Sequence, residues 1–256
     1  MKVTGQSAIV SGGASGLGRA TAERLVAEGV NVTIFDNNIE LGGQAATDTG
    51  ALFVEVDITS EESVVSGISQ AAAAHGPARI LVNCAAIGGP GIRTAGKKGP
   101  HPLDIFQKLV QVNLVGAFNI TRLAASEMVG LDPLERGERG VIINVSSINA
   151  LDGPVGTVAY TAAKAGVVGM TITVARDLAP RGVRACTIAP GNFETPMLMA
   201  APGEMLEALL DSVPFPNDRF GDPADFASLA LHICENIMLN GEVVRLDAAI
   251  RHSHTG

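Results

Sequence analysis

Aromatic and basic residues are scarce in this chain. Tryptophan is absent and tyrosine occurs once, at Tyr160, so the phenolate absorbance of the protein would report on a single residue. Lys and Arg number 18 against 26 Asp and Glu, which gives a net charge of −8 at pH 7 with neutral histidines. This excess of negative charge argues against a sequence-independent surface for nucleic acid. Any anionic ligand must therefore be bound at a local site.

Cysteine is also rare. The three cysteines, Cys84, Cys186 and Cys234, are odd in number, widely spaced and each set in an apolar run. This pattern argues against a disulfide framework and a zinc site, and it predicts reduced core residues of an intracellular protein. No histidine has a spacing to carboxylates or cysteines that is typical of metal ligands; the histidines are His75, His101, His232, His252 and His254. We therefore expect no metal.

Long apolar runs are missing as well. No uninterrupted apolar stretch approaches the ~20 residues of a membrane span. The first predicted strand begins near Ser7, which leaves no room for a signal or transit peptide. These absences predict a soluble, cytoplasmic protein with neither a membrane nor a nucleic acid as partner.

The residues that are present predict one large core. Of the 256 residues, 46% are hydrophobic and 17% are charged, which argues against disorder. We see no internal repeat, low-complexity tract or linker, so we expect a single domain over residues 1–256.

Short β-branched runs alternate with longer helical segments along the chain. Alternation of this kind predicts an α/β fold: a doubly wound Rossmann-type domain with a seven-stranded parallel sheet and helices on both faces. The predicted strands are Ser7–Val10, Val30–Phe35, Leu52–Val56, Ile80–Asn83, Val141–Val145, Val183–Ile188 and Glu242–Leu246. The predicted helices include Leu17–Glu28, Glu61–His75, Leu103–Val129 and Tyr160–Leu178.

Two segments break this alternation, and each follows the end of a strand. Residues 88–102 are rich in glycine and proline and carry Arg93, Lys97 and Lys98. Residues 190–216 form a long segment with several methionines before the last helix and strand. Open α/β sheets bind ligands at the carboxyl ends of their strands. We therefore predict a substrate-side insertion at 88–102 and a substrate loop at 190–216.

A glycine-rich loop joins the first strand to the first helix. Its glycines, Gly12, Gly16 and Gly18, allow a tight turn and let the backbone approach a pyrophosphate at the positive end of the helix. Glycine spacing alone also fits a purely structural turn. The order strand, loop, helix favours dinucleotide binding.

Asp36 ends the second predicted strand, 24 residues after Gly12. A carboxylate at this place accepts the ribose hydroxyls of adenosine and repels a 2′-phosphate. Asn37 and Asn38 follow it, and the glycine loop holds no Lys or Arg. The sequence therefore predicts NAD in preference to NADP. The alternative is a solvated aspartate at a strand end.

Tyr160 and Lys164 lie four residues apart in a predicted helix, so their side chains share a face. A phenol has a pKa of about 10, too high for a base near neutrality, and a neighbouring ammonium is expected to lower it. Ser147 follows a strand end, where it can hydrogen-bond a substrate oxygen and stabilise its charge. Asn113 lies in the long middle helix, where it can bend the helix and hold a water that relays protons to Lys164.

With these residues in view, the chain resembles the short-chain dehydrogenase/reductase family over essentially its whole length. The residues that carry the resemblance are the Ser11–Gly18 loop, Asn83, Asn113, Ser147, Tyr160-Thr-Ala-Ala-Lys164 and Pro190-Gly191. Within the family it is most similar to the type II 3-hydroxyacyl-CoA dehydrogenase branch. That similarity rests on Lys97-Lys98-Gly99, Val168-Gly-Met-Thr171, Ala175-Arg-Asp-Leu-Ala-Pro180 and Leu239-Asn-Gly-Glu-Val-Val-Arg-Leu-Asp247.

The resemblance implies the strand order 3-2-1-4-5-6-7, catalytic Ser147, Tyr160 and Lys164, a supporting role for Asn113, and oxidation of a secondary alcohol. It implies a homotetramer built on the helices that contain Asn113 and Tyr160. The cofactor contacts implied by it or by the glycine loop are Gly12, Ser15, Gly16, Leu17, Gly18, Asp36, Asp57, Ile58, Asn83, Cys84, Tyr160, Lys164, Pro190, Phe193 and Thr195.

Two departures from the family pattern concern the cofactor and the substrate. The usual Asn-Asn-Ala-Gly is here Asn83-Cys84-Ala85-Ala86. Gly153-Pro154-Val155 lacks a glutamine expected near the substrate of the type II branch.

The expected small-molecule substrate is a (3S)-3-hydroxyacyl-CoA, with Ser147 and Tyr160 at its hydroxyl and Lys97 and Lys98 as candidates for its phosphates. A steroid or another secondary alcohol is the alternative substrate. A non-catalytic NAD-binding scaffold or sensor is the alternative class of protein.

Overall fold

The computed structural model describes residues 1–97 and 99–252. Its main sheet has seven parallel strands in the order β3-β2-β1-β4-β7-β8-β9, as expected. The strands are β1 (Ser7–Ser11), β2 (Asn31–Asp36), β3 (Leu52–Glu55), β4 (Ile80–Asn83), β7 (Gly140–Val145), β8 (Val183–Pro190) and β9 (Val243–Leu246). The order reverses direction between β1 and β4, and such a switch point opens a crevice at the carboxyl ends of the strands.

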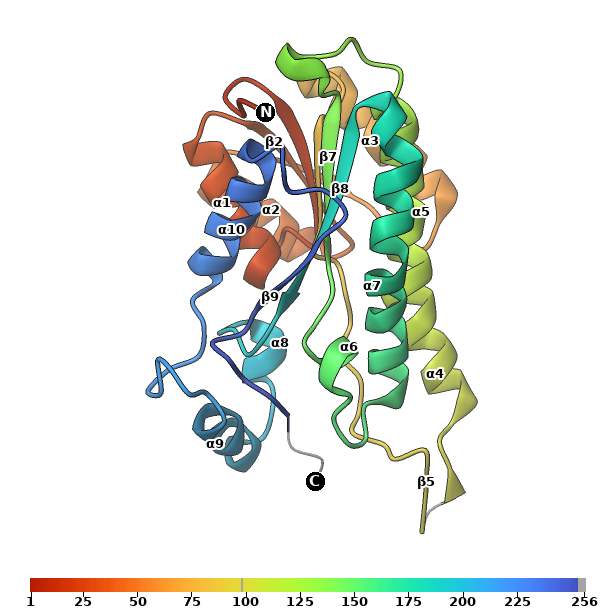
Figure 1. Cartoon of the computed structure of the whole chain (residues 1–256), viewed down its shortest axis with the longest axis vertical. Helices are drawn as coiled ribbons and strands as arrows, with labels where there is room; N and C mark the ends of the chain where they lie inside the picture. Colours follow the sequence, from red (N-terminus) through yellow and green to blue (C-terminus); the bar gives the residue numbers. More distant parts are fainter. Residues whose placement is uncertain (98, 253–256) are drawn as a thin grey trace.

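Helices cover both faces of this sheet (Figure 1). One layer contains α1 (Gly16–Ala27), α2 (Ile39–Thr49) and α10 (Pro223–Glu235), and the other contains α3 (Glu61–His75), α4 (Leu103–Val110), α5 (Ala117–Met128) and α7 (Val158–Leu178). The remaining helices are α6 (Asn149–Asp152), α8 (Pro196–Met199) and α9 (Gly203–Asp211), with short helical turns at Gln111–Gly116, Glu135–Gly137 and Ala179–Arg181. The doubly wound architecture predicted from the alternating pattern is therefore confirmed.

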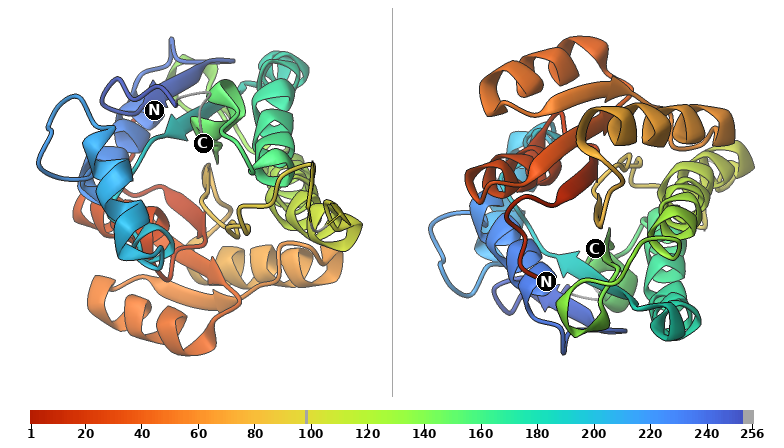
Figure 2. Two further views of the ribbon diagram at one scale, coloured as in Figure 1. Left: turned by 90° about the horizontal axis from the view of Figure 1, so that it is seen from below. Right: turned by 90° about the horizontal axis from the view of Figure 1, so that it is seen from above.

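The carboxyl ends of the strands are flanked by the two irregular segments. Figure 2 (left) looks onto this end, with α8 and α9 on one side and the chain around the β5–β6 hairpin on the other. The hairpin strands are β5 (Ala95–Gly96) and β6 (Gly99–Pro100). The segments 88–102 and 190–216 therefore lie at the end of the sheet where the sequence placed them.

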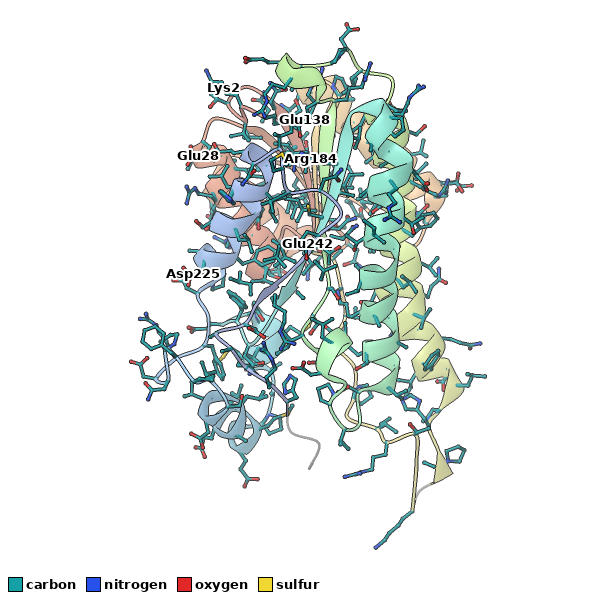
Figure 3. All side chains as sticks on the ribbon, in the orientation of Figure 1. Lys2, Glu28, Glu138, Arg184, Asp225 and Glu242 are labelled. Atoms are coloured by element: carbon teal, nitrogen blue, oxygen red, sulfur yellow. The ribbon has the colours of Figure 1, made fainter. Side chains whose placement is uncertain are left out.

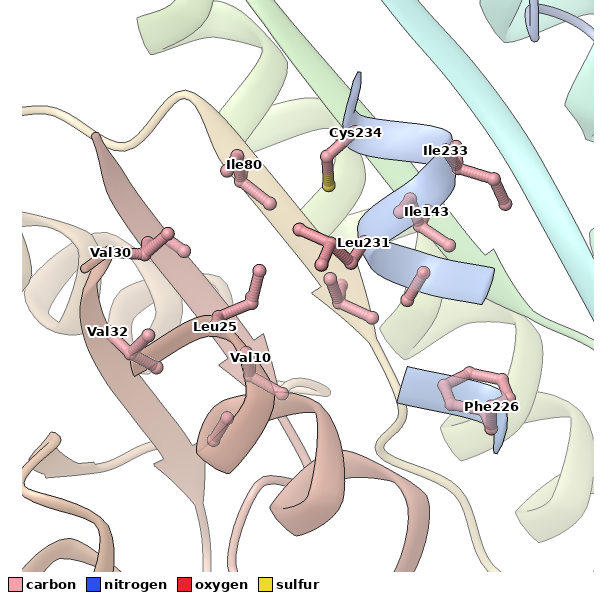
Figure 4. Close-up of a cluster of buried hydrophobic side chains, with 14 of the residues drawn as sticks. Val10, Leu25, Val30, Val32, Ile80, Ile143, Phe226, Leu231, Ile233 and Cys234 are labelled. Atoms are coloured by element: carbon pink, nitrogen blue, oxygen red, sulfur yellow. The ribbon is translucent and has the colours of Figure 1, made fainter. Parts of the chain in front are cut away.

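The inner strands β1, β4, β7 and β8 are fully buried, because their side chains point into both helix layers, whereas β3 and β9 at the edges are only partly buried. Between the sheet and the α1–α10 layer, Leu25, Phe226 and Leu231 pack against Val10 and Ile143 (Figure 4). A second cluster of buried apolar side chains lies under the other helix layer. Burial of apolar surface on both faces stabilises the sheet and fixes where each strand ends.

The amino ends of the strands carry a buried ion pair, far from the crevice. Arg184 on β8 donates from Nε to Glu138 at 2.8 Å and also donates to the carbonyl oxygens of Cys234 and Leu239. Both charged side chains are at most 7% exposed. They lie near the upper end of the molecule in Figure 3. This pair orders the start of β8 and the end of α10, and it is separate from the crevice.

Helix α7 and the turn after it (Val158–Arg181) are long and apolar enough, by length and composition, to cross a membrane. The apolar run is not uninterrupted, since Lys164, Arg176 and Asp177 lie within it. Only a third of the apolar window is buried within the chain. The helix packs along β8, α4 and α6, as a helix of a folded core does.

Candidate active site

The loop between β1 and α1 has the tight glycine backbone and the free amides that a phosphate-binding loop needs. Gly12 has φ +65°, and a Cβ on it would lie 2.6 Å from the backbone nitrogen of Ala85. Gly16 has φ +52°, a conformation that L side chains rarely adopt, and a Cβ on Gly18 would clash with the carbonyl oxygen of Gly12. Ser15 caps α1 without a side-chain hydrogen bond, and the first turn has no acidic residue. The amides of this turn therefore remain available to an anion.

Asp36 closes β2 beside this loop. Its carboxylate accepts hydrogen bonds from the backbone amides of Ala14, at 3.2 Å, and Asn38, at 3.0 Å. The side chain is thereby held at the glycine loop. Asp57, after β3, is exposed and accepts from the amide and hydroxyl of Thr59, while Ile58 is buried against Gly116.

A buried polar network lies behind the crevice. Asn83 donates to Asn144 at 2.8 Å and to Thr121 at 3.0 Å, and it accepts from Ser11 at 3.1 Å. The Ser11 hydroxyl also accepts from the amide of Ala85, at 3.3 Å. The network joins the carboxyl ends of β1, β4 and β7, so Asn83 orders the strand ends rather than facing the crevice with its side chain. Asn144 was not predicted from the sequence, since a single polar residue in an apolar strand gave no motif, and Ser11 was identified only as the first residue of the glycine loop.

Ser147, Tyr160 and Lys164 meet as the spacing predicted. Lys164 Nζ lies 5.8 Å from the centre of the Tyr160 ring and donates to the carbonyl oxygen of Val145 at 2.8 Å. Ser147 is 9% exposed, and its hydroxyl accepts from the amide of Asn149 at 3.1 Å. The three side chains come from the end of β7 and one face of α7.

Burial sets the protonation of this group. It raises the pKa of Tyr160, and the Ser147 hydroxyl beside it offsets part of the rise. Burial also lowers the pKa of Lys164 to about 8. The expectation of a depressed pKa for Tyr160 in the free protein is therefore wrong, because burial of the phenol disfavours its ionised form.

Cys84 belongs to the same buried environment. Burial raises the pKa of its thiol to about 12, and Lys164 lowers it in part. The sequence gave Cys84 no basic neighbour, yet the fold brings Lys164 close to it. The thiol remains protonated at neutral pH, so it is not an activated nucleophile.

Asn113 lies in a π-helical turn, Gln111–Gly116, that interrupts the predicted helix Leu103–Val129. Its side chain donates to the carbonyl oxygen of Ile87 at 2.9 Å and accepts from the Ile87 amide at 2.8 Å. The π-helical turn lies where the helix was expected to bend. Its amide group is used to hold the chain after β4, so any water must be bound by other atoms of this turn.

The remaining cofactor candidates lie after β8. Pro190 is its last residue, and Thr195 caps α8 by accepting from the amide of Leu198 at 3.3 Å. Phe193 is 7% exposed and packs edge-to-face on Phe226 at 6.4 Å, so its ring belongs to the core. Leu17 packs against the same core cluster. This chain segment can present backbone groups to a cofactor.

The insertion forms one wall of an open cleft of about 410 Å³. The opposite wall is the Gly153–Gly156 loop, and the amide of Ile92 donates to the carbonyl oxygen of Gly156 at 2.9 Å. Arg93 lines this cleft, whereas Lys97 lies at the exposed turn of the hairpin. Lys98 lies outside the described residues. Arg93 was noted in the insertion from the sequence, but only Lys97 and Lys98 were candidates for the substrate phosphates.

The residues fit a nicotinamide dinucleotide. The glycine loop leaves no room for side chains, the first turn of α1 offers free amides, and Asp36 is tied to the same loop. Tyr160 and Lys164 lie across the switch point from this loop, beyond the ends of β4 and β7. A cofactor bound at the glycine loop would extend its nicotinamide half toward this acid–base pair.

Known proteins show the same combination. The profile of the short chain dehydrogenase family matches residues 6–205. The human 3-hydroxyacyl-CoA dehydrogenase type-2 is 47% identical over 252 residues, which cover 97% of this chain and 96% of that protein. The Drosophila melanogaster protein of the same name is 46% identical over 251 residues, covering 95% and 96%.

A solved structure agrees with the fold. The crystal structure of 3-hydroxyacyl-CoA dehydrogenase type-2 from Mycobacterium avium superposes with a TM-score of 0.93 and 41% identity, covering 98% of each chain. The chain therefore belongs to the short-chain dehydrogenase family, and it is an oxidoreductase that acts on CH-OH groups of small molecules with a nicotinamide cofactor.

Proposed function

We propose that the protein catalyses the NAD-dependent oxidation of a (3S)-3-hydroxyacyl-CoA to a 3-oxoacyl-CoA. The observation that carries the proposal is the joint presence of Ser147, Tyr160 and Lys164 beside a dinucleotide loop, in a chain that is 47% identical to a protein of that name along nearly its whole length. The whole chain, 1–256, would act as one dinucleotide-binding domain.

Each of the three side chains has one part in this reaction. Ser147 donates a hydrogen bond to the substrate oxygen and fixes its position. Tyr160 removes the hydroxyl proton as the carbinol carbon loses hydride, and the cofactor supplies the hydride acceptor. Lys164 brings a positive charge to the phenol, and its low pKa suits a group that exchanges protons near neutrality.

NAD is the proposed cofactor because Asp36 stands where a 2′-phosphate would have to lie. Its carboxylate is held by two backbone amides, and the positions after it are Asn37 and Asn38. The proposed contacts remain those implied by the resemblance, with Phe193 and Asn83 acting through their backbone or the strand ends that they order.

The experiment that tests the function is a substrate panel. Acyl-CoA substrates of several chain lengths are compared with steroids and short secondary alcohols by the appearance of NADH. The proposal predicts the highest kcat/KM for a (3S)-3-hydroxyacyl-CoA and none for its (3R) isomer. A higher value for a steroid would favour the hydroxysteroid alternative, and no NADH with any alcohol would favour a non-catalytic NAD-binding protein.

Arg93 is the proposed contact for the coenzyme A phosphates. We expect Arg93→Ala to raise the KM for an acyl-CoA roughly twofold to fivefold, because an exposed charge pair contributes up to about 1 kcal/mol. Lys97→Ala is the matched control and should have a smaller effect, since Lys97 lies outside the cleft.

Steady-state kinetics at low and high salt check this prediction. The effect of Arg93→Ala should shrink as salt screens the charges, and the KM of an uncharged ketone should not change. Equal effects on both kinds of substrate would show that Arg93 acts through the shape of the cleft.

The proposal includes a homotetramer in the cytoplasm. Several apolar side chains on α4, the π turn, α5 and α7 are more than a third exposed in the single chain: Leu103, Val115, Phe118, Val158 and Ile172. Contact with further copies would bury them. The cytoplasm is proposed because three widely spaced cysteines in apolar runs predict reduced thiols.

A further inference from the structure

The chain after β9 crosses the same end of the sheet as the active site and is held there by Arg245. Arg245 donates from both terminal nitrogens to the two carboxylate oxygens of Asp152, at 2.7 and 2.9 Å, and from Nε to Asp247 at 2.6 Å. A bidentate guanidinium–carboxylate pair fixes orientation as well as distance. Asp152, Arg245 and Asp247 are 10%, 21% and 7% exposed, so solvent screens them little.

The backbone between these contacts is strained. Ala248 and Ala249 have φ values of +51° and +62°, a region that L residues with a Cβ avoid. The Asp247 carboxylate accepts from the amide of Ala249 at 3.2 Å, and the carbonyl oxygen of Asp247 accepts from the amide of Ile250 at 3.0 Å. The ion pairs therefore maintain a turn that the sequence Ala-Ala does not favour by itself.

This turn delivers Ile250 to the residue that follows Ser147. Ile250 and Ile148 are each 1% exposed and form a small core cluster with Val213. Asp152, at the other end of the Arg245 pair, closes α6, the helical turn that starts directly after Ile148. The Ile148 amide also donates to the carbonyl oxygen of Pro190 at 3.1 Å. The Ser147 turn is thus held by Ile250 and Arg245 of the C-terminal segment on one side and by the end of β8 on the other.

We propose that Arg245 is a positioning residue for the reaction: its clamp on Asp152 and Asp247 seats Ile250 against Ile148 and thereby fixes Ser147 relative to Tyr160. This role rests on the proposed function of Ser147. Arg245 donates to neither the glycine loop nor the insertion, although Asp247 packs on Gly191 and Asp152 adjoins the Gly153–Gly156 wall of the cleft. We therefore expect loss of the clamp to lower kcat more than it weakens cofactor or acyl-CoA binding.

The kinetic test compares Arg245→Gln with Arg251→Gln. Arg251 donates to the same Asp247 carboxylate at 3.0 Å but is 62% exposed, so its loss removes an equal charge without opening the clamp. Arg245→Gln should lower kcat about tenfold or more, since a misplacement near 1 Å is costly. The KM for the acyl-CoA and the Kd for NAD should stay within about twofold of the unmodified protein, and Arg251→Gln should change none of these values.

Asp152→Asn should reproduce the loss of Arg245→Gln, and the double variant should lose little more, because the two residues act as one unit. Arg245→Lys keeps the charge without the bidentate contact, so its kcat should lie between those of the unmodified protein and Arg245→Gln. If Arg245→Gln does not fold, the kcat values of Arg245→Lys and Ile250→Ala are compared with that of Arg251→Gln instead. Equal kcat for the Arg245 and Arg251 variants would overturn the proposal.

A second readout needs no substrate. Protein labelled with an isotope at the ring Cζ of tyrosine gives one NMR signal, from Tyr160. The phenol senses the Ser147 hydroxyl beside it, so Arg245→Gln should shift this signal in the folded protein and Arg251→Gln should not. A protein that oxidises no hydroxyacyl-CoA but shows this shift would refute the proposed substrate and support the clamp. An unshifted signal would refute the clamp.

Discussion

Replacing Lys164 by methionine is expected to remove turnover and to stabilise the fold relative to the unmodified protein. This gain in stability should be larger at pH 7 than at pH 10. Turnover should fall about a hundredfold to ten-thousandfold, the usual contribution of acid–base catalysis, because Tyr160 loses the charge that assists its ionisation. The stability effect follows from burial, which holds the pKa of Lys164 at about 8 in the folded protein against an ordinary value of 10.5.

The pH dependence has a fixed sign. Below about pH 8 both the folded and the unfolded chain carry the lysine proton, so the full cost of burying the charge weighs on the fold. Between 8 and 10.5 the folded protein has released the proton and the unfolded chain has not, so stability recovers as pH rises. Melting temperatures at several pH values check this: the gain of Lys164→Met over the unmodified protein should shrink across that interval. A constant gain would show that Lys164 is not buried as an ammonium.

Replacing Asp36 by serine together with Asn37 by arginine is expected to reverse the cofactor preference. The unmodified protein should favour NAD over NADP at least about tenfold in kcat/KM, or ~1.4 kcal/mol, because the Asp36 carboxylate repels a 2′-phosphate. The double variant removes that charge and adds a guanidinium, which binds phosphate well.

Kinetics with both cofactors and one substrate check this prediction. Asn38→Arg is a useful control, because it adds the same charge while leaving Asp36 in place. Equal kcat/KM for NAD and NADP in the unmodified protein would show that Asp36 does not select the cofactor.

Most of the sheet can be predicted from the sequence, because strands buried on both faces must be continuously apolar. The run at Ile80–Asn83 has the predicted bounds, and the others differ by a few residues at their ends. Helix α2 (Ile39–Thr49) was not among the predicted helices. It contains two adjacent glycines and few large apolar residues, so its periodicity is weak.

The site could be predicted where spacing along one element fixes geometry. Tyr160 and Lys164 share a helix face, and Ser147 follows a strand end. The predicted fold was therefore enough to predict that the three side chains lie close together. The pKa of Tyr160 could not be predicted, because it depends on how fully the phenol is buried. The Arg245–Asp152 pair joins residues 93 positions apart, and no local pattern announces such a contact. The position of Arg93 depends likewise on how the insertion folds back on the Gly153–Gly156 loop.

The central claim, that Tyr160 is the base of an NAD-linked oxidation, is tested most directly by titrating the one tyrosine of the chain. The phenolate absorbance is followed against pH in the folded protein, with and without NAD, and for Tyr160→Phe. Because burial raises its pKa, the phenol should titrate above about 10 in the free protein, and the positive nicotinamide should lower the midpoint. Tyr160→Phe should lose both the absorbance band and turnover with a hydroxyacyl-CoA. A midpoint that NAD leaves unchanged, with turnover retained in Tyr160→Phe, would contradict the assignment.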